Sequence, residues 1–497
     1  MNSGDERPQD RRTFLKRSAL AASGLAAAAG PGCKTSPAKR SAQARPNVLW
    51  LMTDEQRTDS LGCYGSPWAV SPHLDAFARE GVVFRNALTG SPLCTPGRCS
   101  LLTGQYPAET GVWTNHGKPS GPLPHLPHVM AQAGYRTASF GKQHYDTQNR
   151  AWQDQEQIVL SDAVSYFSYA PQYPMDRYDV VQYPGPPYKW IFGGHHPEPI
   201  EHTAEYSVVQ KAKGWLTARS SDKPFLLQLS FNAPHTPVSV PAPFVTAVPE
   251  ESIHFPAEAE GLPDYAPVPL RKLYEMARSD RLTPEQVRKS RRYYFGLTAC
   301  VDHLCGEFLN WMHRQGLLEN TIVVFVSDHG AHLGDFGMYQ KQTFFNPALN
   351  VPFFFWYPRS VTGGVTLDTP VSTTSLLPTV MELAGVELPE RVRGRSLADA
   401  LTRGREPKPR PVFSGHALSS FNLCPGKLNV AVRDGDWKFT SWDTPNAEGR
   451  TLVNLRDDPY ERRNRMNDPA CRGVAKRLTV CIAEHLAAGR SPDPNAL

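Results

Sequence analysis

Four short apolar runs constrain the fold more than any other feature of the sequence. They cover residues 48–52, 135–140, 225–231 and 322–326, and amphipathic helical patterns such as residues 73–80 and 301–315 lie between them. Near-continuous apolar runs of this length are typical of strands buried on both faces, as in a parallel sheet covered by helices. The sequence therefore predicts an α/β fold with a large, mostly parallel central sheet flanked by helices.

Each of these runs ends in ionisable residues. Asp54-Glu55, Lys142 with His144, His235, and Asp328-His329 follow the four runs in chain order. The carboxyl ends of parallel strands meet at one edge of a sheet, and ligands bind there in open α/β folds. A single polar strand end means little, because strands often end in polar turns. Four such ends together favour a functional site.

The composition of this set indicates two kinds of chemistry. Asp54, Glu55, Asp328 and His329 supply mostly hard oxygen donors, which suit Ca²⁺ or Mg²⁺ better than zinc.

Lys142 and the later Lys341 can hold the oxygens of an anion, and His144 and His235 can move protons near neutral pH. The nine cysteines include no CxxC pair, so neither a zinc ribbon nor a disulfide framework is indicated.

The stretch PLCTPGRCSLLTG, residues 92–104, adds an unusual cysteine. Thr95 followed by Pro96 predicts an N-cap and a first helical position, which places Cys94 just ahead of a helix. Free backbone N–H groups there favour anions, and Arg98 follows four residues later. This environment favours an ionised or chemically altered Cys94. The alternatives are a structural thiol or a bridge to Cys99, whose geometry within one helix would be poor.

These motifs resemble those of a known family. The stretch C-T-P-G-R at 94–98 with L-T-G at 102–104 resembles the C-x-P-x-R…TG signature of type I sulfatases, in the alkaline-phosphatase-like superfamily. G-K-Q-H at 141–144 is similar to the second signature of that family, and D-H-G-A-H-L-G-D at 328–335 with Lys341 is similar to a third. The resemblance covers about residues 46–469.

The resemblance implies a formylglycine mechanism. A maturation enzyme would oxidise Cys94 to an aldehyde whose hydrated form attacks the sulfur of a sulfate ester. Metal coordination and Arg98 would hold the diol.

The resemblance also implies roles for the remaining residues. Lys142 and Lys341 would bind the sulfuryl oxygens, and His235 would hydrogen-bond the sulfate or help protonate the leaving alcohol. His144 would take the proton from the second hydroxyl, which expels sulfate and regenerates the aldehyde.

Two positions depart from the family pattern. Many members carry Asp-Asp where this chain has Asp54-Glu55, so Glu55 is either a fifth ligand or leaves the metal to Asp54, Asp328, His329 and residue 94. Gly97 stands where many relatives have Ser. Two other functions remain open: a phosphonate monoester or phosphodiester hydrolase of the same fold, and an exported metal-bound binding protein without turnover. The complete set of catalytic residue types argues against the second.

The N-terminus has the order of a twin-arginine export signal. Residues 11–16 read R-R-T-F-L-K, and an apolar run from 19 to 29 follows that is too short to span a membrane. We expect export to the periplasm by the twin-arginine machinery, with a lipid anchor at Cys33 as an alternative and no transmembrane span. Residues 1–45 hold nine basic and three acidic residues, and the rest of the chain holds 44 and 45. Charge therefore gives the body no reason to bind nucleic acid.

We expect three parts: the signal and linker at 1–45, a catalytic domain at 46–402, and a smaller α+β domain at 403–497. The linker "RGREPKPRP" begins the last part. A hairpin signal through Asp434-Gly435-Asp436 and a final helix with Val474, Leu478, Cys481 and Leu486 on one stripe follow it. The segments 151–201 and 241–285 are expected to be long loops over the active edge.

Overall fold

The computed structural model describes residues 45–145, 152–158, 178–182, 190–196, 198–219, 222–253, 260–418, 428–444 and 449–489. Residues 45–497 form one compact unit. The predicted export signal, including Cys33, lies outside the described residues. Among the described residues, no helix is long and apolar enough to cross a membrane.

The four predicted strands form the centre of an eight-stranded sheet. The order is β13 (Val365–Leu367), β2 (Val82–Phe84), β12 (Phe353–Trp356), β9 (Thr321–Ser327), β1 (Asn47–Asp54), β8 (Phe225–Pro234), β4 (Arg136–Gly141) and β5 (Asp154–Glu156). β9, β1, β8, β4 and β5 are mutually parallel, whereas β12 runs antiparallel to both of its neighbours. The predicted fold class is confirmed.

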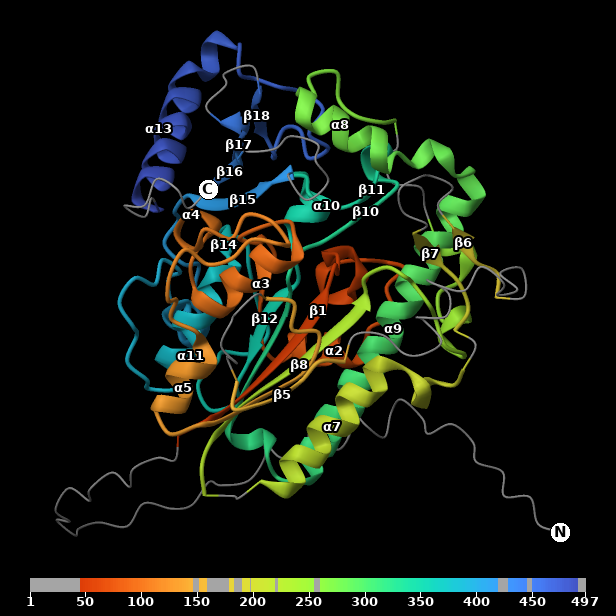
Figure 1. Cartoon of the computed structure of the whole chain (residues 1–497), viewed down its shortest axis with the longest axis vertical. Helices are drawn as coiled ribbons and strands as arrows, with labels where there is room; N and C mark the ends of the chain where they lie inside the picture. Colours follow the sequence, from red (N-terminus) through yellow and green to blue (C-terminus); the bar gives the residue numbers. More distant parts are fainter. Residues whose placement is uncertain are drawn as a thin grey trace, which may run out of the picture. The chain divides into compact units, whose positions relative to one another are not determined.

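Alternate side chains of β1 enter two separate hydrophobic cores, which explains its continuous apolar sequence. Leu49 and Leu51 pack on one face, and Val48, Trp50 and Met52 on the other. The first face is covered by α2 (Pro72–Arg79), α7 (Ala204–Ala218) and α9 (Pro284–Arg314), and the second by α3 (Cys94–Thr103), α5 (Leu126–Gln132), α11 (Leu376–Leu383) and α12 (Ala398–Arg403). Figure 1 shows α7 and α9 on one side of the sheet and α3, α5 and α11 on the other.

Two helical segments were not predicted. The segment expected as a loop at 241–285 contains α8 (Val268–Ala277), and α9 begins at Pro284 rather than near residue 301. A capping box starts α9: the Thr283 hydroxyl accepts the Gln286 N–H, and the Gln286 side chain accepts the Thr283 N–H. The sequence carries that signal, T-P-E-Q, directly before the helix. The segment at 151–201 is described only in part.

The C-terminal part is an antiparallel sheet covered by a helix. The elements are β15 (Val412–Ala417), β16 (Leu428–Asp434), β17 (Trp437–Thr444), β18 (Arg450–Asn454) and α13 (Arg472–Gly489). The predicted hairpin is confirmed: Asp434 pairs with Trp437, and Gly435 makes the turn at φ 59°. The buried stripe of α13 is Ala475, Leu478 and Ile482. Of the other predicted positions, Val474 and Leu486 lie at its margins, and Cys481 is not part of this hydrophobic cluster. The division at residue 402 stays a prediction.

Short elements complete the fold. They are β3 (Ala87–Leu88) with β14 (Val371–Ser372), β6 (Val181–Gln182) with β7 (Ile191–Gly193), β10 (His332–Leu333) with β11 (Tyr339–Gln340), α4 (Pro107–Thr110) and α10 (Asn346–Leu349). The β10–β11 hairpin leads directly into Lys341, so it places that lysine relative to the central sheet.

Candidate active site

Polar residues from separate strands meet at the carboxyl edge of the sheet. Asp54 is the last residue of β1, and Asp328 and His329 directly follow β9. The two strands are neighbours, with Thr53 in register with Ser327, so Asp54 and Asp328 lie side by side.

Cys94 lies at the start of α3 and is 1% exposed. The predicted N-cap at Thr95 is wrong, because the helix begins at Cys94 itself. The Thr95 N–H and hydroxyl instead bond to Asn115. A Cβ at Gly97 would lie 2.9 Å from the Ser91 carbonyl oxygen and 3.1 Å from that of Asp328. A larger residue at 97 would push α3 away from β9, so glycine allows this close approach.

The Arg98 guanidinium bonds to residues in or directly after four strands of the sheet, β1, β4, β8 and β9. It donates to Asp328 Oδ2 and Asp54 Oδ2, each at 2.7 Å, to the Lys142 carbonyl oxygen at 2.7 Å and to Ser230 Oγ at 3.0 Å. Burying a charge is costly unless it is paired, and two carboxylates offset that cost here. Sequence reasoning missed Ser230, although Gln228 and Ser230 are visible as the two polar residues within the run at 225–231.

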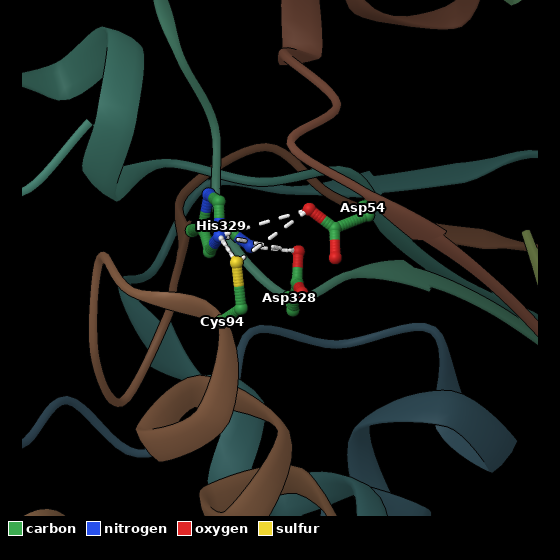
Figure 2. A group of neighbouring side chains, drawn as sticks. All are labelled: Asp54, Cys94, Asp328 and His329. Atoms are coloured by element: carbon green, nitrogen blue, oxygen red, sulfur yellow. Dashed lines mark hydrogen bonds and ion pairs between the residues drawn. The ribbon is translucent and has the colours of Figure 1, made fainter. Parts of the chain in front are cut away.

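Four potential metal ligands face one another beside this arginine (Figure 2). Cys94 Sγ lies 3.2 Å from His329 Nε2 and 3.8 Å from Asp54 Oδ1. His329 Nε2 lies 3.7 Å from Asp328 Oδ1 and 3.9 Å from Asp54 Oδ1. The ligand atoms of all four residues lie within 4.8 Å of one another. This donor set, with two carboxylates and one imidazole, fits a hard divalent cation.

Charges around Cys94 favour its ionised form. Burial and the neighbouring Asp54 carboxylate raise the pKa of the Cys94 thiol. Lys341 and Lys142 act in the opposite direction, and the pKa lies well below its usual value. The two lysines thus favour the thiolate form of Cys94.

The pKa values of the two buried carboxyls shift in opposite directions. Burial raises the pKa of Asp54, but Lys142 and Arg98 hold it well below its usual value. Burial and repulsion by Asp54 raise the pKa of Asp328. Burial lowers the pKa of His329, but its anionic neighbours, Asp328 first, raise it to about 9. The pKa shifts thus follow the close packing of acidic and basic groups at this edge of the sheet.

A second group borders the first. Lys142 Nζ lies 2.7 Å from Asp54 Oδ2, and Lys341 Nζ lies 2.8 Å from Glu55 Oε2. His235 Nε2 lies 3.4 Å from the same Glu55 oxygen. Glu55 is therefore grouped with Asp54 and His235 rather than with Cys94. Its backbone has φ 65°, a strained value for a residue other than glycine.

His144 is the predicted site residue that the structure leaves outside this arrangement. Its side chain is exposed, whereas Lys142 two residues earlier is buried. Its backbone also has a positive φ, 42°. The other nine predicted site residues lie in or beside the two groups.

Similarity to known proteins agrees with this geometry. A family model described as "Sulfatase" matches residues 46–386, and one described as "N-sulphoglucosamine sulphohydrolase, C-terminal" matches residues 334–487. The chain is 29% identical to the ulvan-active sulfatase of Formosa agariphila over 463 residues, covering 89% of this chain and 81% of that protein.

Solved structures agree with the fold. A structure bound to its substrate D-glucosamine-2-N,6-O-disulfate superimposes with a TM-score of 0.72 at 22% identity, covering 90% of this chain and 99% of the other. The phosphonate monoester hydrolase of Silicibacter pomeroyi gives a TM-score of 0.76 at 22% identity, covering 90% and 96%.

The fold is therefore that of the alkaline-phosphatase-like superfamily. Within that superfamily, the chain belongs to the sulfatase family, since the family model spans well over half of its length. It is a sulfuric ester hydrolase, and the resemblance read from its sequence motifs is confirmed.

Proposed function

We propose that this sulfatase hydrolyses sulfate esters of saccharides or small alcohols through a formylglycine formed at Cys94 and one divalent cation. The position of Cys94 Sγ, 3.2 Å from His329 Nε2 and 3.8 Å from Asp54 Oδ1, carries the proposal. It puts the modified side chain among metal-ligand atoms. Peptide mass spectrometry of active enzyme tests it: an aldehyde at position 94 is expected, and fully active enzyme with an intact thiol would contradict it.

The proposed cation is Ca²⁺, with Mg²⁺ as the alternative. The proposed ligands are Asp54, Asp328, His329 and the residue at 94. Glu55 is a further proposed ligand, because its carboxylate lies within 4.8 Å of the ligand atoms of Asp54 and His235. A bound cation supplies Lewis-acid stabilisation of the oxygen at position 94. Elemental analysis is expected to give one ion per chain.

We assign binding of the sulfuryl oxygens to Lys142 and Lys341. Both ammonium groups are buried and border the Cys94 cluster, where a low dielectric strengthens their attraction for an anion. Arg98 holds Asp54 and Asp328 in place and so orients the residue at 94. Each lysine replaced by alanine is expected to lower kcat/KM on an aryl sulfate by about 10²-fold.

Two histidines are assigned to proton transfer. His235 Nε2 points into the group bordering Cys94, which suits protonation of the leaving alcohol. His144 would take the proton from the second hydroxyl, and its exposed side chain would turn inward to do so. His144→Gln tests this directly: covalently trapped sulfate on residue 94 is expected, and normal turnover would remove His144 from the mechanism.

The saccharide part of the proposal rests on relatives. One structural neighbour was solved with D-glucosamine-2-N,6-O-disulfate, and one sequence relative is named for activity on ulvan. Rates on sulfated saccharides and small sulfate esters would identify the substrate class. Parallel rates on aryl sulfate and aryl phosphonate esters would test the alternative of phosphonate or phosphodiester hydrolysis.

Export by the twin-arginine machinery is proposed from residues 11–29, as is maturation by a formylglycine-generating enzyme before export. The periplasm is the proposed destination, with a lipid anchor at Cys33 as the alternative. Replacing Arg11 and Arg12 by Lys is expected to retain the protein in the cytoplasm with residue 94 still modified. Unchanged export of that variant would exclude this route. We also propose that the compact unit consists of a catalytic domain at 46–402 and a smaller α+β domain at 403–497.

A further inference from the structure

Lys341 lies in a strained loop. Its two neighbours, Gln340 and Gln342, have backbone φ angles of 74° and 71°. Residues other than glycine rarely adopt positive φ angles of this size. Such a conformation persists only where the surrounding structure enforces it. One constraint comes from the cysteine segment, because the Gln342 N–H donates to the Pro92 carbonyl oxygen at 3.1 Å. Another comes from His332, whose Nε2 lies 2.7 Å from Thr343 Oγ1.

The remaining constraint comes from the C-terminal sheet. Lys438 of β17 and Glu461, which follows β18, form an ion pair whose side chains are each 2% exposed. Lys438 Nζ donates to the Phe344 carbonyl oxygen at 2.6 Å and to Asn346 Oδ1 at 3.3 Å. Glu461 Oε1 accepts the Asn346 N–H at 2.9 Å.

The pair therefore holds the chain three to five residues beyond Lys341. Aromatic packing reinforces the contact: the Phe344 ring lies 4.9 Å from His416 and 5.1 Å from Trp442, both in the C-terminal sheet. A buried ion pair is weak evidence for stability, so the contacts of Lys438 and Glu461 with residues 344 and 346 carry the inference that follows.

We propose that Lys438 and Glu461 are positioning residues for Lys341. They fix the loop at 340–346 so that the Lys341 ammonium group reaches the sulfuryl oxygens of the substrate. The inference rests on the role assigned to Lys341 under the proposed function. It gives the C-terminal sheet a part in catalysis, although the ligand group at Cys94 found among the described residues includes none from that sheet.

The test is a kinetic cycle on an aryl sulfate. Lys438→Met is expected to lower kcat/KM by about 10- to 100-fold, because displacing a binding group by about 1 Å costs rate on this scale. In a Lys341→Ala background, the same substitution is expected to cost less than about 3-fold, because the loop then has no ammonium group to position. Lys438→Arg, which keeps a cation, is expected to recover part of the loss.

Two controls separate positioning from stability. Leu478→Ala weakens the core beneath the same sheet without touching the loop, and Arg456→Met breaks the exposed Arg456–Asp436 pair. Both variants are expected to keep kcat/KM within about 2-fold of the wild type when assayed well below their melting temperatures. Should Lys438→Met fail to fold, Glu461→Gln serves instead. It keeps an acceptor for the Asn346 N–H, and a loss of about 3- to 10-fold is expected.

The outcomes distinguish the role of Lys341 in binding sulfate from its positioning by Lys438 and Glu461. If Lys341→Ala is impaired but Lys438→Met and Glu461→Gln are not, the positioning inference is overturned and the role of Lys341 stands. Equal losses from Lys438→Met with and without Lys341 would also overturn it. If Lys341→Ala has normal kinetics, both the role of Lys341 and its positioning are wrong.

Discussion

Arg98 and Arg57 are both buried, and each pairs with two carboxylates, yet only one of them lies in a potential catalytic site. Arg98 uses one oxygen of Asp54 and one of Asp328. The other oxygen of Asp54 faces Cys94 and His329. The other oxygen of Asp328 lies 3.7 Å from His329 Nε2 and accepts the backbone N–H groups of Glu55 and His329.

Arg57 bonds to all four carboxylate oxygens of its two partners. Its guanidinium bonds to both oxygens of Asp59 and both of Asp335, and Asp335 Oδ2 also accepts the Leu333 N–H. Buried charge alone therefore does not define a site. The Arg98 cluster, which we define as Arg98, Asp54, Asp328, His329 and Cys94, differs in one respect. The salt bridges to Arg98 use only the Oδ2 atoms of Asp54 and Asp328, so both Oδ1 atoms stay outside those salt bridges.

The strongest expected contrast is at Cys94. Cys94→Ala removes the group that the rest of the Arg98 cluster surrounds, and kcat/KM on an aryl sulfate is expected to fall at least about 10³-fold. The melting temperature should change little, because only a small buried side chain is shortened. Substantial turnover by this variant would mean that the available ligand atoms serve some other chemistry.

The two arginines themselves give the next contrast. Arg57→Met removes the closest partner of the buried Asp335 and leaves it with the Leu333 N–H and Arg291, whose Nη1 lies 3.9 Å from Asp335 Oδ2. The free energy of unfolding is therefore expected to fall by up to about 3–5 kcal/mol. Its folded fraction should retain kcat/KM within a few-fold, whereas Arg98→Met should lose about 10²-fold or more. Denaturant unfolding and initial rates measure the two effects. If Arg57→Met were as inactive as Arg98→Met at equal folding, the comparison would fail.

Removal of the proposed cation should act on one cluster alone. A cation present at about 100 times its dissociation constant stabilises the fold by about 2.7 kcal/mol, so chelation should lower the melting temperature of the wild type. Asp328→Asn should be nearly insensitive to chelation, and Arg57→Met should respond like the wild type. Calorimetry with and without chelator, alongside elemental analysis, measures this; equal shifts in all three proteins would place the ion elsewhere.

The smallest expected effect is the pH dependence of stability that arises from His332, which lies beside Asp335, the partner of Arg57. Burial lowers the pKa of His332, beside Asp335, to about 4. Its unfolded form binds a proton more readily, so stability is present above about pH 6.5 and is lost as the pH falls toward 4. The loss between pH 7 and pH 5 should be about 2 kcal/mol. His332→Gln, which can still bond to Thr343, should reduce this slope; an unchanged slope would assign it to other groups.

The strands and the residues at their ends could be predicted because local sequence determines them. Runs such as residues 322–326 are apolar throughout, since β9 feeds two cores at once. Parallel pairing then brings Asp54 and Asp328 together without knowledge of any loop. The start of α9 was also readable, from its capping box at Thr283.

Other features depend on tertiary contacts that no local pattern encodes. Thr95 followed by Pro96 is typical of an N-cap, but Thr95 lies inside α3, and its N–H and hydroxyl donate to Asn115. The pairing of Glu55 with Lys341 joins residues 286 positions apart. Lys438 and Glu461 look like ordinary surface charges in the sequence, and their burial follows only from packing against the loop at 344–346.

The burial of Cys94 has a consequence for protein synthesis. His329, which contacts its sulfur, is encoded 235 residues later, so the folded surroundings of Cys94 cannot exist until the ribosome has added them. At about 5–20 residues per second, this delay is roughly 10 to 50 s. An enzyme that modifies Cys94 would have that interval of translation in which to act, and slower codons between the two positions would lengthen it.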